Sequence, residues 1–329
     1  MKMDLSLSPI IRSLLILIVG LATIPGSGCS IKRMAVNKLG DALAGSGTTF
    51  AGDDDPELVE AAIPFSLKLM ESLLAENPRH EGLLFASASG FTQYAYAFVQ
   101  QDAEELEEED FAAAEALKVR ARKLYLRARN YGLRGLEVKH PGFTEALREK
   151  PREAVRVATK QDVRLLYWTA VSWGAAISVS KDDPDLIADQ GIVGALIDRA
   201  FELDESFDQG AIHSFLITYE MARASAGTPA QAEERARRHF ARAVELSKGQ
   251  LAGPYVSLAE AVDVPNQDKA EFKSLLEQAL AINLDATPET RLVNVIMQRR
   301  ARWLLSRTED LFFETKGDDG TTGPRTTDH

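Results

Sequence analysis

The stretch KQDVRLLYWTAVSWGAAISVSKDDPDLIADQGIVGALIDRAFELDESFDQGAIHSFLITYEMARASA, residues 160–226, decides the fold class of this chain. Its apolar residues recur at helical spacing, and turn signals such as Asp183-Pro184 divide it into three successive helices. It concentrates aromatic and small residues but contains no obvious catalytic set. It therefore indicates a helical scaffold that binds something, rather than an enzyme.

The helical pattern extends on both sides of this stretch, from Pro56 to Phe313. Asp55-Pro56 and Thr228-Pro229 each place a capping side chain directly before a proline, as helix N-termini often do. No segment alternates apolar and polar residues over the length of a strand, so we expect an all-α fold. The expected helices cover residues 56–77, 80–101, 111–139, 162–180, 184–203, 208–226, 229–247, 254–264, 267–282 and 288–313.

Similar helix endings recur along the chain and suggest repeated helix pairs. They are LMESLLAENP, LIDRAFELDES, HFARAVELSKG and LLEQALAINLD. Leu203 lies 43 residues before Leu246, which lies 36 residues before Ile282, and these offsets bracket the tetratricopeptide period of about 34. We expect tetratricopeptide-like helical hairpins stacked in a curved array, with residues 288–313 as a cap. A generic helical bundle is the alternative.

The charge of the chain argues against nucleic acid as a partner. The 329 residues carry a formal net charge of −11, whereas phosphate binding relies on clusters of Lys and Arg. The basic residues Arg235, Arg237 and Arg238 alternate with glutamates, as on a solvated helix face. The acidic run at 102–110 lacks the spacing of a calcium loop, and we expect an exposed loop or helix end with no metal.

The first 28 residues have the layout of an export signal. Lys2 and Arg12 flank an n-region, residues 13–24 form a short apolar run, and small residues precede Cys29, the only cysteine. We expect residues 1–28 to be a lipoprotein signal peptide and Cys29 to be lipidated, which anchors the chain to a membrane. Ser30 favours the outer membrane over the inner one. A cleaved signal with an incidental cysteine, or an uncleaved anchor, is the alternative.

The predicted domain organisation follows from these patterns. A tether spans residues 29–55, with a short helix expected over 31–39 and a stretch rich in Gly, Ser, Thr and Asp at 40–55. The helical domain spans 56–314, and a disordered tail spans 315–329.

Individual side chains support no catalytic or cofactor site. His213 stands without a second His or an acidic residue one turn away, and no Gly-rich phosphate loop is present. Trp168 and Trp173 are five residues apart and point to different faces of their helix, so one of them belongs to the core and the other is free to line a cavity. We expect no enzyme, since a hydrolase would need a nucleophile and a base placed together in a cleft.

Four motifs in order resemble the T component associated with tripartite ATP-independent periplasmic (TRAP) transporters. They are LYWTAVSWGAAISVSKDDPDLIAD (166–189), RAFELDESFDQGAIHSFLITY (199–219), HFARAVELS (239–247) and RLVNVIMQRRARWLL (291–305). The resemblance covers residues 32–313. One departure is the residue pair Pro25-Gly26, where a lipoprotein cleavage site usually carries a leucine.

The resemblance implies a lipid-anchored periplasmic protein built of tetratricopeptide-like hairpins. It implies a partnership with the substrate-binding P component of a TRAP transporter, and self-association into a small ring. It also implies a cavity for a hydrophobic or organic-acid ligand. The motif positions expected nearest that cavity are Trp168, Trp173, His213, Tyr219 and Asn294. The alternative function is a general tetratricopeptide lipoprotein that assembles envelope protein complexes.

Overall fold

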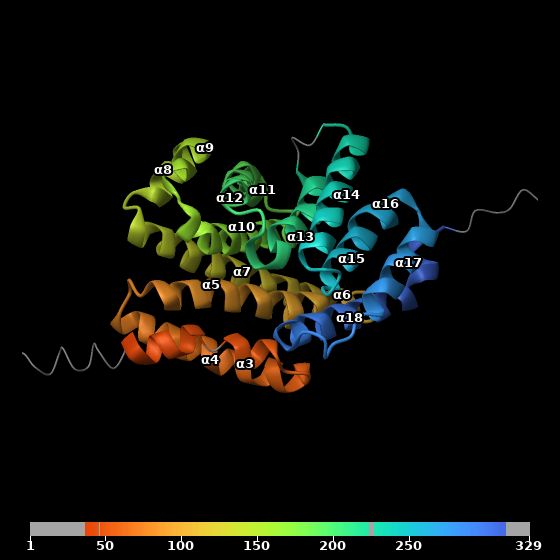
Figure 1. Cartoon of the computed structure of the whole chain (residues 1–329), viewed down its shortest axis with the longest axis horizontal. Coiled ribbons are helices and arrows are strands. Elements are labelled where there is room, and N and C mark those ends of the chain that lie inside the picture. The colour runs from red at the N-terminus through yellow and green to blue at the C-terminus, as the bar shows by residue number, and fades with distance from the viewer. Residues whose placement is uncertain (1–36, 46, 224–226, 314–329) are drawn as a thin grey trace, which may run out of the picture.

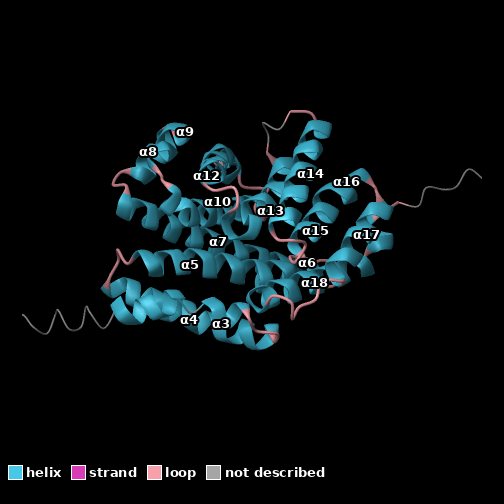
Figure 2. Cartoon of the chain, in the orientation of Figure 1, coloured by secondary structure: helices cyan, strands magenta, loops and turns pink. Residues whose placement is uncertain are grey.

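The computed structural model describes residues 37–45, 47–223 and 227–313, and every regular element in these ranges is a helix (Figures 1 and 2). The all-α prediction is therefore confirmed for this part of the chain. The predicted signal peptide, Cys29 and the predicted tail at 315–329 lie outside the described residues. No helix in the described ranges is both long and apolar enough to cross a membrane.

The helices follow the predicted order, with several expected single helices divided in two. The bounds of the longer ones are α4 (Pro56–Glu76), α5 (Glu81–Ala95), α6 (Gln101–Leu106), α7 (Phe111–Lys139), α8 (Phe143–Glu149), α10 (Val163–Ser178), α12 (Gln190–Leu203), α13 (Phe207–Ala222), α14 (Pro229–Leu246), α15 (Gly253–Leu258), α17 (Lys269–Leu280) and α18 (Arg291–Ser306). The shorter ones are α3 (Gly47–Ala51), α9 (Pro151–Ala154), α11 (Pro184–Ala188), α16 (Val264–Asn266) and α19 (Thr308–Leu311).

The caps that the sequence predicted are present. The side chains of Asp55 and Asp183 accept hydrogen bonds from backbone N–H groups three residues later, at 2.9 and 3.2 Å. Thr228 forms a capping box with Gln231, in which each side chain bonds the other residue's backbone N–H. Proline follows each cap at the first helical position, so local sequence alone fixes where α4, α11 and α14 begin.

The first half of the molecule is a stack of closely packed helices. Helix α7 lies between α5 and α10, and α12 packs against α10 (Figure 1). Gly132 of α7 allows the close approach, because a Cβ atom there would lie 2.1 Å from Oγ1 of Thr169 on α10. The apolar core of this half centres on residues of α10 and α12, with Leu165, Leu166 and Leu196 fully buried.

The second half is built from α13 to α18 and returns to the start of the domain. Helix α13 packs along α14, α17 packs on α15 and α18, and α18 also contacts α3 and α4. One guanidinium nitrogen of Arg291 donates to the carbonyl oxygen of Gly52 at 3.1 Å, which joins the two ends of the described chain. Helix α18 therefore lies beside α3 and α4 (Figure 1).

Part of the predicted tether is folded. Residues 37–45 are helical, as is α3. Leu43 and Ala44 pack against the core cluster that α4 and α5 form between them. The side chain of Asn77, which caps the end of α4, donates to Oδ1 of Asn37 at 2.7 Å. The first described residue thus lies at the C-terminal end of α4.

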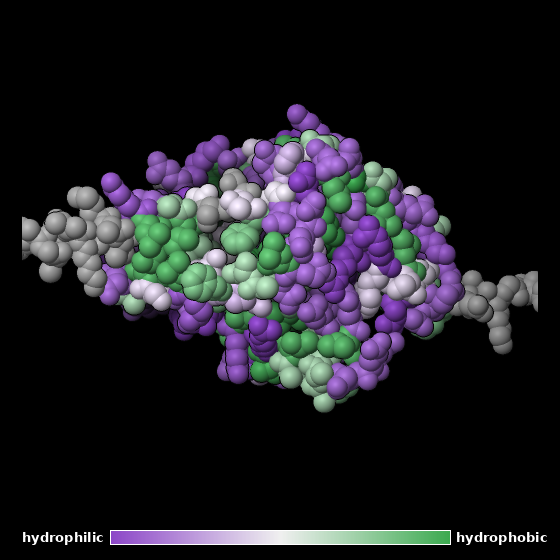
Figure 3. Space-filling model, turned by 90° about the horizontal axis from the view of Figure 1, so that it is seen from below, coloured by the Kyte–Doolittle hydropathy of each residue, from purple (hydrophilic) through white to green (hydrophobic). Residues whose placement is uncertain are grey.

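The underside of the molecule carries exposed apolar side chains. Phe65, which belongs to the predicted apolar stripe of α4, is 73% exposed, whereas Leu73 of the same stripe is buried. Seen from below, apolar residues gather over the half of the molecule next to the first described residues (Figure 3).

Candidate functional site

The two tryptophans of α10 differ in their surroundings. Trp173 is buried, its Nε1 donates to Oδ2 of Asp189 at 3.1 Å, and the guanidinium of Arg129 lies 4.6 Å from its ring centroid. Trp168 is half-buried and meets the ring of Tyr167 edge to face, with the centroids 5.0 Å apart. Of the two, Trp168 is therefore the one with accessible ring surface.

His213 pairs with a second histidine that sequence reasoning did not connect to it. The Nδ1 atoms of His213 on α13 and His239 on α14 are 2.9 Å apart, so one imidazole donates and the other accepts. Phe201 meets both rings edge to face. Burial lowers the pKa of His213 below its ordinary value and the pKa of His239 to about 4, so both rings stay neutral near pH 7.

A left-handed turn makes this histidine contact possible. At the start of α13, Asp208, Gln209 and Gly210 have φ values of 44°, 55° and 89°. A Cβ atom at Gly210 would lie 3.1 Å from the Cβ atom of Leu246 and 3.3 Å from the Cα atom of Ala243, both on α14. The glycine therefore satisfies the unusual backbone conformation and also lets α13 approach α14 closely.

Tyr219 and Asn294 bind backbone groups of neighbouring segments. The hydroxyl of Tyr219 donates to the carbonyl oxygen of Gln190 at 2.9 Å, and so ties α13 to α12. The amide of Asn294 accepts from the N–H of Ala252 and donates to the carbonyl oxygen of Gln250, both at 2.9 Å. Each side chain thus has a structural role, and its place beside a cavity stays a prediction.

The structure brings Trp168, Trp173 and Tyr219 to one core cluster, whereas Asn294 lies beside another. Trp168 and Trp173 lie on α10 within the first half of the molecule, and His213 and Tyr219 lie on α13. Asn294 lies on α18, next to Ala252 and Met297 of a different core cluster.

The arginines of α14 make contacts that the sequence did not reveal. We expected Arg235, Arg237 and Arg238 on a solvated face, but two of them reach neighbouring helices. Nε of Arg235 donates to the buried carboxylate of Glu220 on α13 at 2.6 Å, and Arg237 forms a two-pronged bond with Glu271 on α17 at 2.7 and 2.8 Å. Arg238 follows the prediction and pairs within α14.

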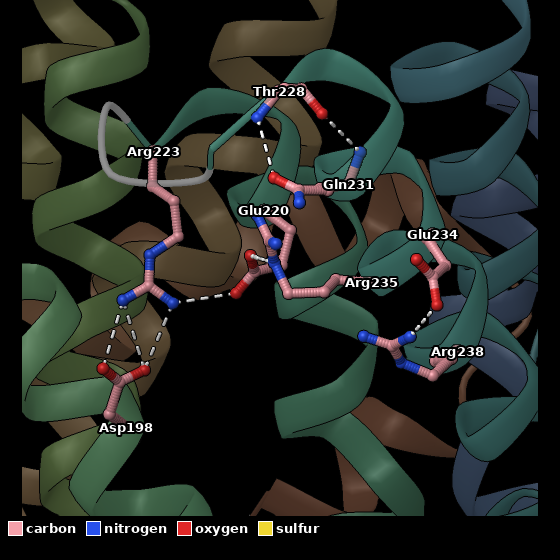
Figure 4. Close-up of polar contacts among 8 residues, drawn as sticks. All are labelled: Asp198, Glu220, Arg223, Thr228, Gln231, Glu234, Arg235 and Arg238. Atoms are coloured by element: carbon pink, nitrogen blue, oxygen red, sulfur yellow. Dashed lines mark hydrogen bonds and ion pairs between the residues drawn. The ribbon is translucent and has the colours of Figure 1, made fainter.

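Figure 4 shows the network around Glu220 at the junction of α12, α13 and α14. Arg223 donates to Glu220 at 2.8 Å and reaches Asp198 of α12 at 3.1 Å. Arg238 and Glu234 lie apart from this network on the outer side of α14. Burial disfavours the charged form of Glu220, but the bonds from Arg235 and Arg223 outweigh it and hold the pKa of this carboxyl below its ordinary value.

A buried arginine lies beside two π-helical turns. Arg300 of α18 is buried over the ring of Trp303 and donates to Glu260 at 2.6 Å, and it also pairs with Glu104 at 2.5 Å. Glu260 belongs to the π-helical turn Ala259–Asp263, and the other π-helical turn, Tyr96–Gln100, leads into α6 with Glu104. Such turns add a residue to the helix and redirect its side chains, which the spacing of apolar residues does not reveal.

The π-helical turn Ala259–Asp263 also contains the buried carboxylate of Asp263, whose negative charge is poorly compensated. Neither oxygen of Asp263 has a hydrogen-bond partner among the described residues, and the nearest guanidinium nitrogen of Arg237 is 3.7 Å away. Burial, assisted by the neighbouring charge of Glu271, raises the pKa of Asp263 to about 7.

Several side chains of the acidic run at residues 102–110 form ion pairs with neighbouring helices. Glu107 pairs with Lys118, Glu108 pairs with Arg307, and Asp102 and Glu105 both approach Arg299 at 3.6 and 3.2 Å. The run therefore connects α6 to α7 and α18. Across the described ranges, no three or more His, Cys, Asp or Glu side chains are arranged to hold a metal ion.

Comparison with known proteins shows to which family the chain belongs. The model of the TRAP transporter T-component family matches residues 52–312. The chain belongs to the TRAP transporter T-component family. The matched range spans α4 to α18, and so includes the helices that carry all five predicted residues. The family groups transporter accessory components rather than enzymes, and it associates the chain with a transporter of the cell envelope.

A relative from Treponema pallidum (strain Nichols) is similar in sequence to this chain over nearly the relative's full length. This uncharacterized protein is 31% identical over 307 residues, which cover 88% of the present chain and 94% of the relative.

Proposed function

We propose that this chain is a lipid-anchored periplasmic accessory component of a TRAP transporter that binds the substrate-binding P component. The family match over residues 52–312 carries this proposal. The layout of the N-terminal sequence supports it, because an apolar run followed by small residues and Cys29 fits a lipoprotein signal. In this proposal the helices form tetratricopeptide-like hairpins, and the anchor is in the outer membrane.

The proposal includes a ligand site for a hydrophobic or organic-acid molecule and self-association into a small ring. Trp168 is the motif residue best placed to contact a ligand, since its ring is only half-buried. Trp173, His213, Tyr219 and Asn294 have polar atoms that already bond other parts of the chain, so they would shape such a site by fixing the helices around it.

Association with the P component is tested with the full chain and the P component of the same organism. The two proteins are co-expressed, and the chain is purified through a C-terminal affinity tag. We expect the P component to co-purify, and an unrelated tagged lipoprotein serves as the control. If the two purified proteins fail to associate at about 50 μM in analytical ultracentrifugation, the proposed partnership is wrong, and a general scaffold for other envelope proteins becomes the better hypothesis.

The anchor is tested separately with Cys29→Ser. We expect the unaltered chain to fractionate with membranes and the Cys29→Ser chain to lose lipidation, as measured by the intact mass of the purified protein. An unaltered chain without added acyl mass would contradict the proposed lipidation without affecting the partnership.

A further inference from the structure

Helix α4 presents large apolar side chains on the side turned away from the core. Phe65 is 73% exposed and Leu58 is 59% exposed. At about 100° per residue, Leu58, Ala61, Ala62 and Leu69 all lie within about 60° of the direction of Phe65. These five residues are called the α4 outer face.

Between Leu58 and Leu69, charged side chains lie off this face or at its edge, whereas Glu76 at the last position of α4 points within about 20° of Phe65. By the same geometry Glu57, Glu60 and Glu71 point about 80–140° away from Phe65. Lys68 borders the face, and its ammonium is paired with Glu71 at 2.7 Å. Between Leu58 and Leu69 the face therefore presents an apolar surface along about three turns of the helix, with Lys68 at its edge. Exposed surfaces of this kind mark interaction sites.

The first described residues extend the same underside. Asn37 is held at the end of α4 by its bond with Asn77, and Leu39, two residues later, is 45% exposed. Figure 3 shows apolar residues gathered on the underside next to this entry point of the chain. The N-terminal segment thus adjoins the C-terminal end of α4, and the α4 outer face begins about 12 Å from this point, at Leu69.

The length of that segment limits how far α4 can be from a membrane anchor. Eight residues separate Cys29 from Asn37, and a fully extended chain of that length spans at most about 28 Å. Helix α4, with its 21 residues, is about 31 Å long. If Cys29 is lipidated, as proposed above, the end of α4 is held within one helix length of the lipid surface.

We propose that the α4 outer face rests on the lipid surface that holds the Cys29 anchor. A single lipid anchor is strengthened by a second membrane contact, and the tethered face meets the surface at a high effective concentration. Lys32, Arg33 and Lys38 lie between the anchor and α4 in the sequence, where their charge favours acidic headgroups. This contact would lay α4 along the membrane and turn α12 and α14, on the opposite side of the molecule in Figure 1, towards the periplasm.

The test uses the full lipidated chain in vesicles of phosphatidylethanolamine and phosphatidylglycerol with brominated acyl chains. Two variants are compared, Phe65→Trp on the α4 outer face and Val157→Trp, whose site is 54% exposed and lies beside α9. Brominated chains quench tryptophan only when the indole enters the bilayer. We expect quenching of the Phe65→Trp signal, after subtraction of the native tryptophans, to exceed that of Val157→Trp at least about two-fold.

The outcomes separate this proposal from the one on which it rests. Equal quenching of the two variants in chains that float with the vesicles would overturn membrane contact by α4 and leave lipidation at Cys29 intact. Chains that do not float would instead contradict the anchor. A Phe65→Asp variant that sediments as a smaller species in detergent would show that a second copy covers the face, which also overturns the proposal.

Discussion

The helices α7, α10 and α12 and the helices α13 to α18 both pack around buried apolar side chains, but more charge pairs cross between helices in the second group. In the first group, fully buried leucines and a glycine contact join the helices, and the indole of Trp173 is satisfied by one hydrogen bond. In the second group, buried or half-buried charges cross between helices, as in Glu220 with Arg235 and Arg300 with Glu260. We infer that charge balance contributes more to stability in the second group than in the first.

The largest expected effect is in the first group. Trp173→Ala should lower the free energy of unfolding by about 3–5 kcal/mol, because the variant leaves a cavity and removes the partner of Asp189. Urea denaturation followed by circular dichroism measures this change. The control Val157→Ala alters a side chain that is 54% exposed and should shift the free energy by no more than about 0.5 kcal/mol. A loss below about 1 kcal/mol for Trp173→Ala would contradict the packing argument.

A somewhat smaller loss is expected in the second group. Arg300→Met leaves two carboxylates without their cation, which for fully buried pairs costs about 3–5 kcal/mol. We expect about 2–3 kcal/mol, because the side chains of Glu104 and Glu260 remain 29% and 28% exposed.

The triple variant Arg300→Met, Glu104→Gln, Glu260→Gln distinguishes charge from packing at this site. It removes the repulsion and should recover most of the lost stability in the same urea assay. If the triple variant is no more stable than Arg300→Met, the arginine acts through its contact with Trp303 instead, and the contrast between the two groups of helices is weakened.

The smallest expected effect concerns Asp263 and depends on pH. Its pKa is about 7 in the folded chain and about 3.8 ordinarily, so the folded state binds the proton more tightly than the unfolded state. Stability from this group is therefore greatest below about pH 4 and is lost progressively as the pH rises to about 7. Asp263→Asn keeps the shape without the charge and should be more stable than the unaltered chain by about 1–2 kcal/mol at pH 8.

The pH series also supplies the control for this prediction. At pH 4 the Asp263→Asn variant and the unaltered chain should differ by less than about 0.5 kcal/mol, since Asp263 is then protonated when folded. A stability difference that is the same at pH 4 and pH 8 would show that the carboxylate is compensated in the fold.

Local sequence signals predicted the helical elements well. The caps at Asp55, Asp183 and Thr228 act between residues three apart, so the sequence contains all their partners. The spacing of apolar residues gave α7 its bounds, Phe111 to Lys139, because a long amphipathic helix needs no distant contact to define it. The division of residues 184–203 into α11 and α12 was missed, although Gly191, the second residue of α12, lies beside the break.

The amino-acid sequence by itself determined the fold class, the caps and the family, because helical periodicity and ordered motifs are properties of residues close together in the chain. Only the tertiary structure decided that His213 meets His239, that Arg235 neutralises Glu220 and that Phe65 faces outward. These outcomes depend on which helices become neighbours. In an all-α protein an apolar stripe on a helix can face the core, another helix or the solvent. The positions of the neighbouring helices decide which of these it faces.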